Sequence, residues 1–442
     1  MKSIFLKVQN AGLVWSLLAA FVVVHQAAAQ DFVLSASPEV GVAPFGITLA
    51  DVNGDGRPDL INANSGDSTL TVLTNGGNGV FGLNATYAVG GAPISVTTTD
   101  INNDGKPDLI SANSGDSTLT ILTNNGNGTF VFFSAEPVGS QPFSVVAASL
   151  TGGSNQSLIS VDFGGNTLTV LTNNGSGIFG SNATYNTGPN PRSVVAVDAN
   201  QDGKTDLICV NFGDNTVTVL TNNGNGIFGF KAVYSVGNGP VSVAAVDVNG
   251  DAALDLITAN LFDSTVTVLT NGGNGIFGFK AAHAVGLNPE SVTAADVNGD
   301  GSPDLITANY SEATVTVLTN NGHGTFTLSS TGTVGDGPIF VAAADVNGDV
   351  APDLITANYG SAATGNTLSV LLNPLAPPPL KIRFTNAHTA LISWLPAWPG
   401  YVLQQNSDLT TTNWTDVSNP SGTNRVSIST TTGEQFFRLL HP

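Results

Sequence analysis

The chain has 442 residues, and its 32 acidic residues outnumber its 12 basic residues, which gives a formal net charge of −20. This balance argues against a nucleic-acid-binding protein, because binding to phosphates needs a basic surface that displaces counterions. The single cysteine, Cys209, excludes an internal disulfide bond. It lies in an apolar segment, so we expect a buried structural thiol.

The first 29 residues have the pattern of a secretory signal peptide. Two lysines precede an apolar run over residues 11–24, which ends shortly before the small-residue sequence 27–29. An uncleaved membrane anchor is the alternative, but His25 and Gln26 end the run before it reaches the length of a membrane span. We expect cleavage after Ala29, no remaining membrane span, and a bacterial protein that is secreted or held at the cell surface.

A ten-residue segment, 51–60, recurs along most of the chain. Every interval between neighbouring copies is 49 residues, and a fixed period of this kind indicates one repeated supersecondary unit. After the first copy at Asp51, close copies begin at Asp100, Asp198, Asp247, Asp296 and Asp345, and a degenerate copy begins at Ser149.

Each unit contains four short runs of apolar and β-branched residues, separated by turns rich in Gly, Asn, Asp and Pro. In the second unit these runs are residues 95–100, 108–113, 118–124 and 129–138. Gly and Asn interrupt every apolar run before a helix could form. Four strands per repeat, arranged radially, predict an all-β protein with the architecture of a β-propeller.

The phase of the repeat predicts how the ring closes. Residues 32–41 correspond to the fourth strand of a unit, but they precede the first complete unit. The last unit ends after its third strand, at residues 372–373. We therefore expect the N-terminal strand to complete the last of seven blades, within a propeller domain that spans residues 30–373 and has no open sheet edge.

The repeated segment has the composition of a cation site. Oxygen-bearing side chains occupy its first, third, fifth and ninth positions, and Gly56 at the sixth allows a sharp turn. Unlike the calcium loop of helix-loop-helix sensors, it leads into a β-like run and has no Glu at the twelfth position. It therefore predicts a calcium-binding turn between two strands. The predicted ligands, which include the peptide carbonyl of the seventh residue in four loops, are Asp51, Asn53, Asp55, Arg57 and Asp59; Asp100, Asn102, Asp104, Lys106 and Asp108; Asp198, Asn200, Asp202, Lys204 and Asp206; Asp247, Asn249, Asp251 and Asp255; Asp296, Asn298, Asp300, Ser302 and Asp304; and Asp345, Asn347, Asp349 and Asp353.

The pattern Asp-x-Asn-x-Asp-Gly-x-x-Asp-Leu-Ile, followed by a Gly-rich turn and Phe at residues 78–81 and 127–130, resembles the FG-GAP or VCBS repeats of integrin α-subunit propellers and of many secreted bacterial proteins. The resemblance covers about three quarters of the chain. It implies a calcium-binding β-propeller. It leaves the ligand open, since adhesins, lectins and enzymes share such blades.

The copies differ at positions that matter for binding calcium. Gly is replaced at the sixth position by Ala252 and by Val350, and the β-branched Val350 resists a positive φ angle. The loop at Ser149 has no carboxylate, so we expect no ion there. Four to six structural Ca²⁺ ions are therefore expected, with dissociation constants on the order of 10⁻⁴ to 10⁻³ M.

Up-and-down connectivity assigns the calcium loops and the Asn-Gly turns to one face of the ring. On the opposite face, the residue after the second strand is aromatic in four units, at Phe163, Phe212, Tyr310 and Tyr359. These side chains are candidate ligand-binding residues. Packing between blades is the alternative that we favour. A recurrent acid nearby, at Asp67, Asp116, Asp214, Asp263 and Glu312, is attributed to turn formation.

No catalytic motif is evident. The histidines of the mature chain occupy unrelated repeat positions, and the sequence has neither a Gly-x-Ser-x-Gly nor a His-Glu-x-x-His pattern. Carboxylates are abundant, so an acid–base pair of the glycosidase type stays an open alternative.

The composition changes after residue 373. Residues 374–379 read as a proline-rich linker, and residues 380–442 contain short strand-like runs that predict a small β-sandwich, similar in pattern to fibronectin type III domains. Its tryptophans Trp394, Trp398 and Trp414 are expected in the core.

The sequence thus predicts a secreted, calcium-stabilised propeller that acts as a non-catalytic binding or adhesion module. Its partner would be an extracellular protein or glycan, and not a nucleic acid. A carbohydrate-binding lectin and a polysaccharide hydrolase or lyase are the alternatives. The lectin alternative expects the four aromatic residues to be exposed.

Overall fold

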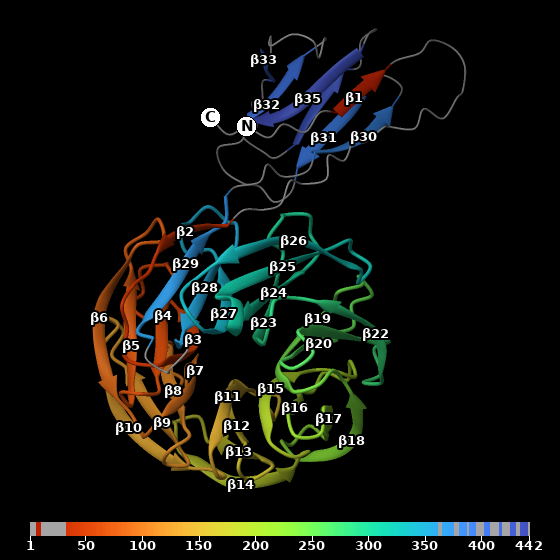
Figure 1. Ribbon diagram of the computed structural model, residues 1–442. Helices are drawn as coiled ribbons and strands as arrows, with labels where there is room; N and C mark the ends of the chain where they lie inside the picture. Colours follow the sequence, from red (N-terminus) through yellow and green to blue (C-terminus); the bar gives the residue numbers. More distant parts are fainter. Residues whose placement is uncertain are drawn as a thin grey trace.

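The computed structural model describes residues 6–9, 32–360, 365–374, 380–386, 389–394, 402–406, 415–417, 425–429 and 434–440. Over these residues the regular structure is β, apart from the 3₁₀ turn η1 (Tyr310–Glu312). Seven four-stranded antiparallel sheets surround a common axis, as Figure 1 shows. The predicted all-β fold with a seven-bladed propeller is therefore confirmed.

The blades, numbered here 1 to 7 in chain order, each begin with an innermost strand at the axis. Blades 1 to 3 consist of β3 (Pro44–Ala50), β4 (Asp59–Asn64), β5 (Thr69–Asn75) and β6 (Phe81–Ala88); β7 (Pro93–Thr99), β8 (Asp108–Asn113), β9 (Thr118–Asn124) and β10 (Phe130–Pro137); and β11 (Pro142–Ala148), β12 (Ser157–Asp162), β13 (Thr167–Asn173) and β14 (Phe179–Asn186). Blades 4 to 6 consist of β15 (Pro191–Val197), β16 (Asp206–Asn211), β17 (Thr216–Asn222) and β18 (Phe228–Ser235); β19 (Pro240–Val246), β20 (Asp255–Asn260), β21 (Thr265–Asn271) and β22 (Phe277–Ala284); and β23 (Pro289–Ala295), β24 (Asp304–Asn309), β25 (Thr314–Asn320) and β26 (Phe326–Thr333).

Blade 7 is built from both ends of the propeller sequence. Its strands are β27 (Pro338–Ala344), β28 (Asp353–Asn358), β29 (Thr367–Leu372) and the N-terminal β2 (Val33–Ala36). In the antiparallel pairing of β2 with β29, Val33 lies opposite Leu372 and Leu34 opposite Leu371. The predicted closure by an N-terminal strand is confirmed. It gives the outer edge of β29 a hydrogen-bonded neighbour.

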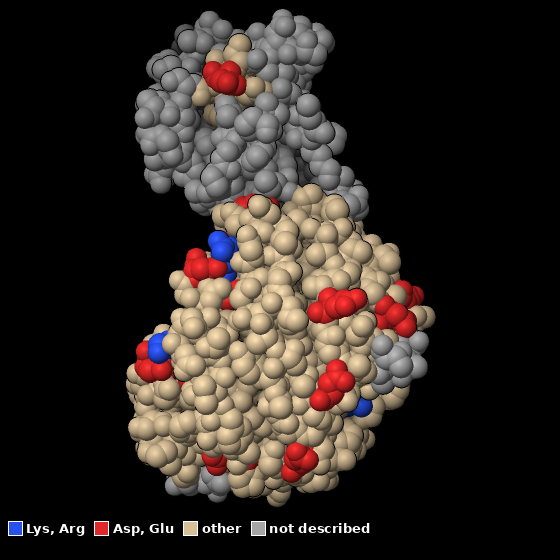
Figure 2. Space-filling model, turned by 90° about the vertical axis from the view of Figure 1, so that its left-hand side faces the viewer, with Lys and Arg blue, Asp and Glu red and all other residues tan. Residues whose placement is uncertain are grey.

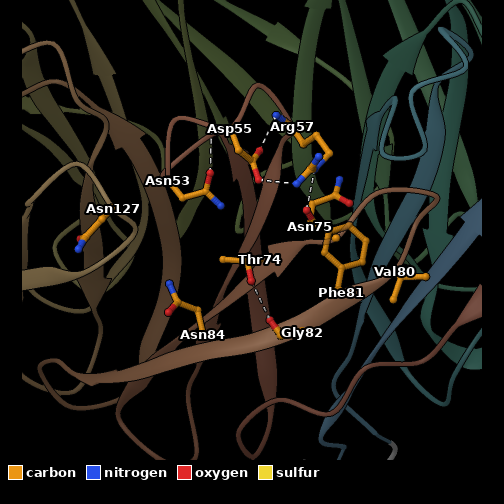
Figure 3. A pocket seen from close by; sticks show the side chains of 11 residues that line it. Asn53, Asp55, Arg57, Thr74, Asn75, Val80, Phe81, Gly82, Asn84 and Asn127 are labelled. Carbon is orange, nitrogen blue, oxygen red and sulfur yellow. Dashed lines mark hydrogen bonds and ion pairs between the residues drawn. The ribbon is translucent and has the colours of Figure 1, made fainter.

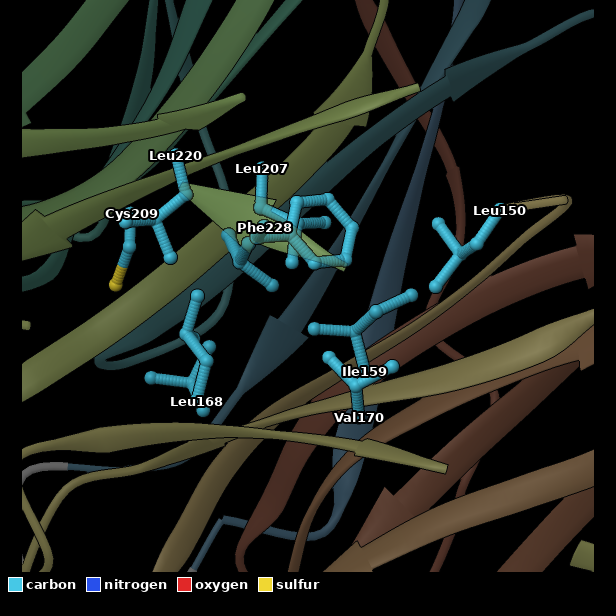
Figure 4. Close-up of a cluster of buried hydrophobic side chains, with 10 residues drawn as sticks. Leu150, Ile159, Leu168, Val170, Leu207, Cys209, Leu220 and Phe228 are labelled. Atoms are coloured by element: carbon cyan, nitrogen blue, oxygen red, sulfur yellow. The ribbon is translucent and has the colours of Figure 1, made fainter. Parts of the chain in front are cut away.

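Apolar side chains fill the spaces between neighbouring blades. All residues of the second strands, such as β4 and β8, are buried, because each of these strands packs against blades on both of its faces. Seven apolar clusters result, one between each pair of neighbouring blades, including blades 7 and 1. Figure 4 shows the cluster between blades 3 and 4. It contains Cys209, whose buried position raises the pKa of its thiol, as expected for a structural cysteine.

A ring of asparagines connects each blade to the one before it. The third strand of each blade ends in a buried Asn or is followed directly by one, and its Nδ2 donates to the carbonyl of the second residue of the preceding blade's Asp-rich loop. The donor–acceptor distances are 2.7–2.9 Å in all seven blades. The donors are Asn75, Asn124, Asn173, Asn222, Asn271, Asn320 and Asn373, and the acceptors are Val346, Val52, Ile101, Leu150, Ala199, Val248 and Val297.

The remaining strands form two small sheets outside the propeller. One has the order β1 (Leu6–Gln9), β35 (Glu434–Leu440), β32 (Val402–Asn406) and β33 (Thr415–Asp416), and the other has the order β30 (Leu380–Asn386), β31 (Thr389–Trp394) and β34 (Arg425–Ser429). The predicted β-sandwich stays an expectation. Most of the linker, 375–379, lies outside the described residues.

The segment predicted as a signal peptide is described only in part. β1 belongs to it and pairs with β35, so cleavage after Ala29 would remove this strand from its sheet. The cleavage site itself lies outside the described residues. Within the described part of the chain, no helix is long and apolar enough to cross a membrane.

Candidate functional site: the Asp-rich loops and the opposite face

The Asp-rich loops connect the first and second strands of each blade and are closed by their own side chains. In blade 1, Asp51 accepts hydrogen bonds from the amides of Gly54 and Gly56, both at 2.7 Å, and Asn53 Oδ1 accepts the amide of Asp55 at 2.9 Å. These bonds hold oxygen-bearing side chains of one short loop in a fixed arrangement.

The sixth residue of the loop is held in the same way in all six Asp-containing copies. Its amide donates to Oδ2 of the first Asp at 2.7 or 2.8 Å, and its φ lies between 69° and 89°. Ala252 and Val350 adopt this left-handed conformation as well, with φ values of 69° and 76°. The turn geometry expected from Gly at this position is therefore imposed on residues that disfavour it.

The ninth-position Asp fastens the loop to the rest of its blade. In blade 1, Asp59 is fully buried, and its two oxygens accept the amides of Val52 at 3.1 Å and Asn75 at 2.8 Å. The sequence pattern did not reveal this second role. The same pair of bonds recurs at Asp108, Asp206, Asp255, Asp304 and Asp353.

Burial and neighbouring negative charge both act on these carboxylates. Burial is the larger cause that raises the pKa of Asp59, and the charges of Asp55 and Asp51 raise it further. The same causes raise the pKa of Asp304 and that of Asp353 to about 7. A bound cation would stabilise such a group of carboxylates in its ionised form.

The types of donor atom in these loops suit a hard cation. Carboxylate, amide and carbonyl oxygens are the ligands that Ca²⁺ prefers. The described residues nevertheless contain no group of three or more acidic, His or Cys side chains already close enough together to hold a metal ion. In three loops the seventh residue is basic and lies near the fifth-position Asp, and the nitrogen–oxygen distances are 2.7 Å for Arg57–Asp55, 3.6 Å for Lys106–Asp104 and 3.5 Å for Lys204–Asp202.

The degenerate loop of blade 3 forms a turn without carboxylates, but only its fourth residue, Gly152, has a positive φ, whereas the other copies have one at the sixth residue as well. Ser149 Oγ donates to the carbonyl of Gly153 at 2.5 Å, whereas the first Asp of the other loops accepts backbone amides. Ser157 stands at the ninth position. Hydrogen bonding alone is thus enough to form a turn at this place in a blade.

A pocket of about 450 Å³ lies beside the loop of blade 1 (Figure 3). Its lining includes Asp55, Arg57, Asn75 and Asn84. These polar side chains bond within the protein: Arg57 pairs with Asp55 and donates to the carbonyl of Asn75, and Asn84 Nδ2 donates to the carbonyl of Gly128. The pocket therefore offers few free polar groups to a ligand.

The four aromatic candidates on the opposite face are all half-buried. Phe163 packs against Phe143, with ring centroids 5.8 Å apart, and Tyr359 packs edge-on against Phe45 at 5.7 Å. Phe212 contacts Phe262 at 5.5 Å. Tyr310 Oη donates to the carbonyl of Gly360 at 3.3 Å, which connects blades 6 and 7. The full exposure that the lectin alternative expects is not found at these positions.

The recurrent acids of this face bond to the backbone. Asp67, Asp116 and Asp263 each accept the amide of a residue in the connection that leads into their own blade, at 2.5–2.7 Å. Asp214 accepts the hydroxyl of Thr216 at 2.7 Å. These contacts agree with the role in turns that was assigned to these acids.

Two charged residues at the centre of this face were missed from the sequence. Arg192 and Glu290 are the second residues of the innermost strands of blades 4 and 6, and their side chains approach to 3.7 Å. They stand at the same repeat position, where the other five units have apolar residues. Aligning the units column by column would have revealed them.

On the side of the molecule that Figure 2 shows, charged side chains are sparse among the coloured residues, and acidic groups outnumber basic ones there. The absence of a nucleic-acid partner stays an expectation from the acidic composition of the chain.

Comparison with known proteins supports the fold. BBS1N, in a complex with ARL6DN, superposes with a TM-score of 0.57 at 12% identity, over 78% of this chain and 98% of that one. A protein from Lactobacillus plantarum gives 0.52 at 13% identity, over 92% and 100%. A lectin from Agrocybe aegerita that recognises terminal N-acetylglucosamine gives only 0.45 at 20% identity, over 66% and 80%, and supports no inference here. These likenesses concern the fold alone, and no curated protein matches significantly.

The repeats themselves identify the family. The FG-GAP-like repeat matches six overlapping or adjoining segments, 51–111, 100–152, 156–209, 198–258, 254–307 and 296–356. These segments cover well over half of the chain, and each extends from one blade of the propeller into the next. The chain therefore belongs to the family of FG-GAP-like repeat proteins.

Proposed function

We propose that this protein is a secreted, non-catalytic binding module, in which four to six calcium ions stabilise a propeller that binds an extracellular protein or glycan. The observation that carries the calcium part is the repeated loop, in which the first Asp gathers the amide of the sixth residue in six blades. The FG-GAP-like propeller supports a binding role, because such blades present variable loops on a rigid ring.

The face opposite the calcium loops is the proposed ligand surface. The calcium-side loops are nearly uniform around the ring, whereas the opposite face differs from blade to blade at residues 163, 212, 262, 310 and 359. A ligand that contacts only some of the blades needs such differences. Calcium would then act on stability and leave recognition to the other face.

Thermal unfolding with calcium and with a chelator tests the calcium part. A ligand that binds only the folded state stabilises it by mass action. At 10 mM Ca²⁺ and a dissociation constant of about 1 mM, this amounts to about 1.4 kcal/mol per site. We expect a large upward shift in the unfolding temperature with Ca²⁺, a smaller one with Mg²⁺, and four to six bound ions per chain by elemental analysis.

A pair of variants assigns the ions to the loops. Asp104→Asn removes one proposed ligand charge while keeping an oxygen that can accept the amide of Lys106, so we expect one fewer ion per chain. Thr151→Ala, in the loop without carboxylates, should leave the count unchanged. If the wild-type protein binds no calcium and is not stabilised by it, the loops are hydrogen-bonded turns and nothing more.

A further inference from the structure

The innermost strands share one repeat position that faces the centre of the ring. It is the second residue of each strand, and it is apolar in five blades and charged in two. The seven residues, in blade order, are Phe45, Ile94, Phe143, Arg192, Val241, Glu290 and Ile339.

Contacts between alternate blades show that these side chains meet across the axis. Phe45 of blade 1 touches Phe143 of blade 3, with ring centroids 5.6 Å apart. Arg192 Nη1 of blade 4 lies 3.7 Å from Glu290 Oε2 of blade 6. Because another blade lies between the members of each pair along the ring, they can meet only near the axis. The strands begin on the face opposite the Asp-rich loops, so this meeting point lies toward the proposed ligand face.

Arg192 is unusual among the basic residues of the propeller. Residues 32–373 contain six Lys or Arg residues. Three lie in Asp-rich loops and pair with acids there, and Lys231 and Lys280 lie on the outer strands β18 and β22. Arg192 is thus the single basic side chain at the centre of the ring, and its exposed fraction is only 19%.

Stability does not explain the Arg192–Glu290 pair. Their 3.7 Å separation is too long for a hydrogen bond, and the buried Arg192 Nε has no hydrogen-bond partner. Burial raises the pKa of Glu290 and lowers that of Arg192, which reflects the cost of placing both charges there. Apolar residues fill this position in the other blades, and replacing a buried ion pair by apolar residues is often neutral or stabilising. Such a departure from local consistency is typical of functional sites.

Aromatic rings surround the guanidinium group. Its central carbon lies 4.2 Å from the ring centroid of Phe212, 5.1 Å from that of Phe143 and 5.7 Å from that of Phe163. These contacts hold the planar group by cation–π attraction and restrict its orientation. Phe212 in turn contacts Phe262, which is 58% exposed.

Phe262 is a second departure from the repeat, and the neighbouring backbone accommodates it. The residues at this repeat position, in blade order, are Gly66, Gly115, Gly164, Gly213, Phe262, Ser311 and Gly360. Gly239 lies beside the ring, and a Cβ atom added there would come within 2.6 Å of Phe262 Cδ2. Most other blades carry a side chain at the position of Gly239. Blade 5 thus combines an added exposed ring with a glycine that makes room for it.

We propose that Arg192, Glu290 and the Phe212–Phe262 pair form a binding site for a neutral sugar residue near the axis of the ring, on the face opposite the Asp-rich loops. This proposal rests on the proposed ligand face. The N–H groups of Arg192 would donate to a hydroxyl oxygen, and Glu290 would accept from an adjacent hydroxyl, since each sugar hydroxyl both donates and accepts. The C–H face of the sugar ring would lie against Phe262.

The neutrality of the sugar follows from the charges of the site. Arg192 and Glu290 together have no net charge, so a charged ligand would compensate one of them and leave the other unpaired. Asp214, Asp263 and Glu312 on the same face further disfavour an anion. A basic peptide would have to displace Arg192 from Glu290 and from three aromatic rings.

An array of immobilised neutral oligosaccharides tests the proposal with the full mature chain in calcium. We expect binding to at least one neutral oligosaccharide, and stronger binding than to uronate oligosaccharides or basic peptides. Phe262→Gly, which restores the residue of the other blades, should weaken that binding at least tenfold. Phe230→Ala removes an even more exposed aromatic ring, 69% exposed, from an outer strand and should leave the binding unchanged.

A double variant separates recognition from folding. Arg192→Met combined with Glu290→Ile introduces apolar residues at this position, so we expect an unfolding temperature equal to or above that of the wild type, with binding lost. A strongly lowered unfolding temperature would instead show that the Arg192–Glu290 pair stabilises the fold, and would overturn the proposal.

Three array results would also overturn it: no binding to any neutral oligosaccharide, preference for uronates or basic peptides, or binding that both variants leave intact. The last result would agree with a binding role for the protein but would place the binding site elsewhere on it. The calcium measurements are independent of all three, so a failure of the calcium proposal is distinguishable.

Discussion

At the scale of single residues, Val350 shows the cost of departing from the repeat. It stands where four other loops have Gly, and its φ of 76° is strained for a β-branched side chain. The side chain is 49% exposed, so little packing offsets the strain.

Val350→Gly is therefore expected to stabilise the protein by about 1 kcal/mol. A left-handed conformation costs about 1–2 kcal/mol, and the larger conformational entropy that Gly loses on folding offsets part of the gain. Urea unfolding with a chelator present would measure this. Ala252→Gly should have a smaller effect, because Ala lacks the branched Cβ. Equal effects of the two variants would contradict the explanation by strain.

Asp162 provides a prediction about pH. It occupies the position of Asn64, Asn113 and their equivalents in the other blades, and it is fully buried. Burial raises its pKa above the ordinary value of 3.8, although hydrogen bonds from Thr169, Ser160 and others oppose the change. The folded protein thus keeps a proton that the unfolded chain releases. Stability should therefore fall as the pH rises above about 4 and through the folded-state pKa.

Asp162→Asn should remove that fall. The variant restores the residue of the other blades, whose amide donates to two Thr hydroxyls, as Asn113 does to Thr118 and Thr120. We expect it to be more stable than the wild type at pH 7, because the wild type loses stability as the pH rises through the raised folded-state pKa of Asp162. Urea unfolding between pH 4 and pH 7 should show a difference that grows with pH. A difference independent of pH would exclude the titration of Asp162 as its cause.

At the scale of elements, the strands were predictable and their connections only partly so. The runs of β-branched residues and the Gly and Asn turns placed the four strands of blade 2 within two residues of their observed bounds. The asparagine ring was not foreseen, because Thr-Asn-Asn-Gly reads as an ordinary turn. Its donors join segments at least 72 residues apart, as in Asn124 to Val52, and no local pattern reveals such a contact.

Asn124→Ala tests the connection between blades 1 and 2. Asn124 Nδ2 donates to the carbonyls of Val52 at 2.9 Å and Pro107 at 3.0 Å. Its removal leaves buried carbonyls without donors, so we expect a loss of about 2–3 kcal/mol in urea unfolding. Asn125→Ala is the control, since the exposed Asn125 bonds only to Thr129 within its own turn. Similar losses in both variants would argue against the inter-blade bond.

At the scale of the whole molecule, the period of the sequence predicted the ring, its seven blades and its closure. The period could do so because each unit buries its apolar faces only against its neighbours. It could not predict the centre of the ring. Arg192 and Glu290 are 98 residues apart in the sequence, and only the closed circle brings them together. Repetition thus reveals the scaffold, whereas the exceptions to it mark the candidate site.

The contribution of β2 to blade 7 sets an order of events during synthesis. The N-terminal strand emerges first, but its partner β29 ends at Leu372, so the circle cannot close until nearly all of the propeller has been delivered. The third strands of the other blades resemble β29 closely, as Thr167–Asn173 and Thr265–Asn271 do, and during this interval they are competing partners. Two chains that fold side by side could also exchange β2 and form a linked pair. Because the blades resemble one another, β2 can pair correctly with β29 only if the outer strand of every other blade already occupies its own place.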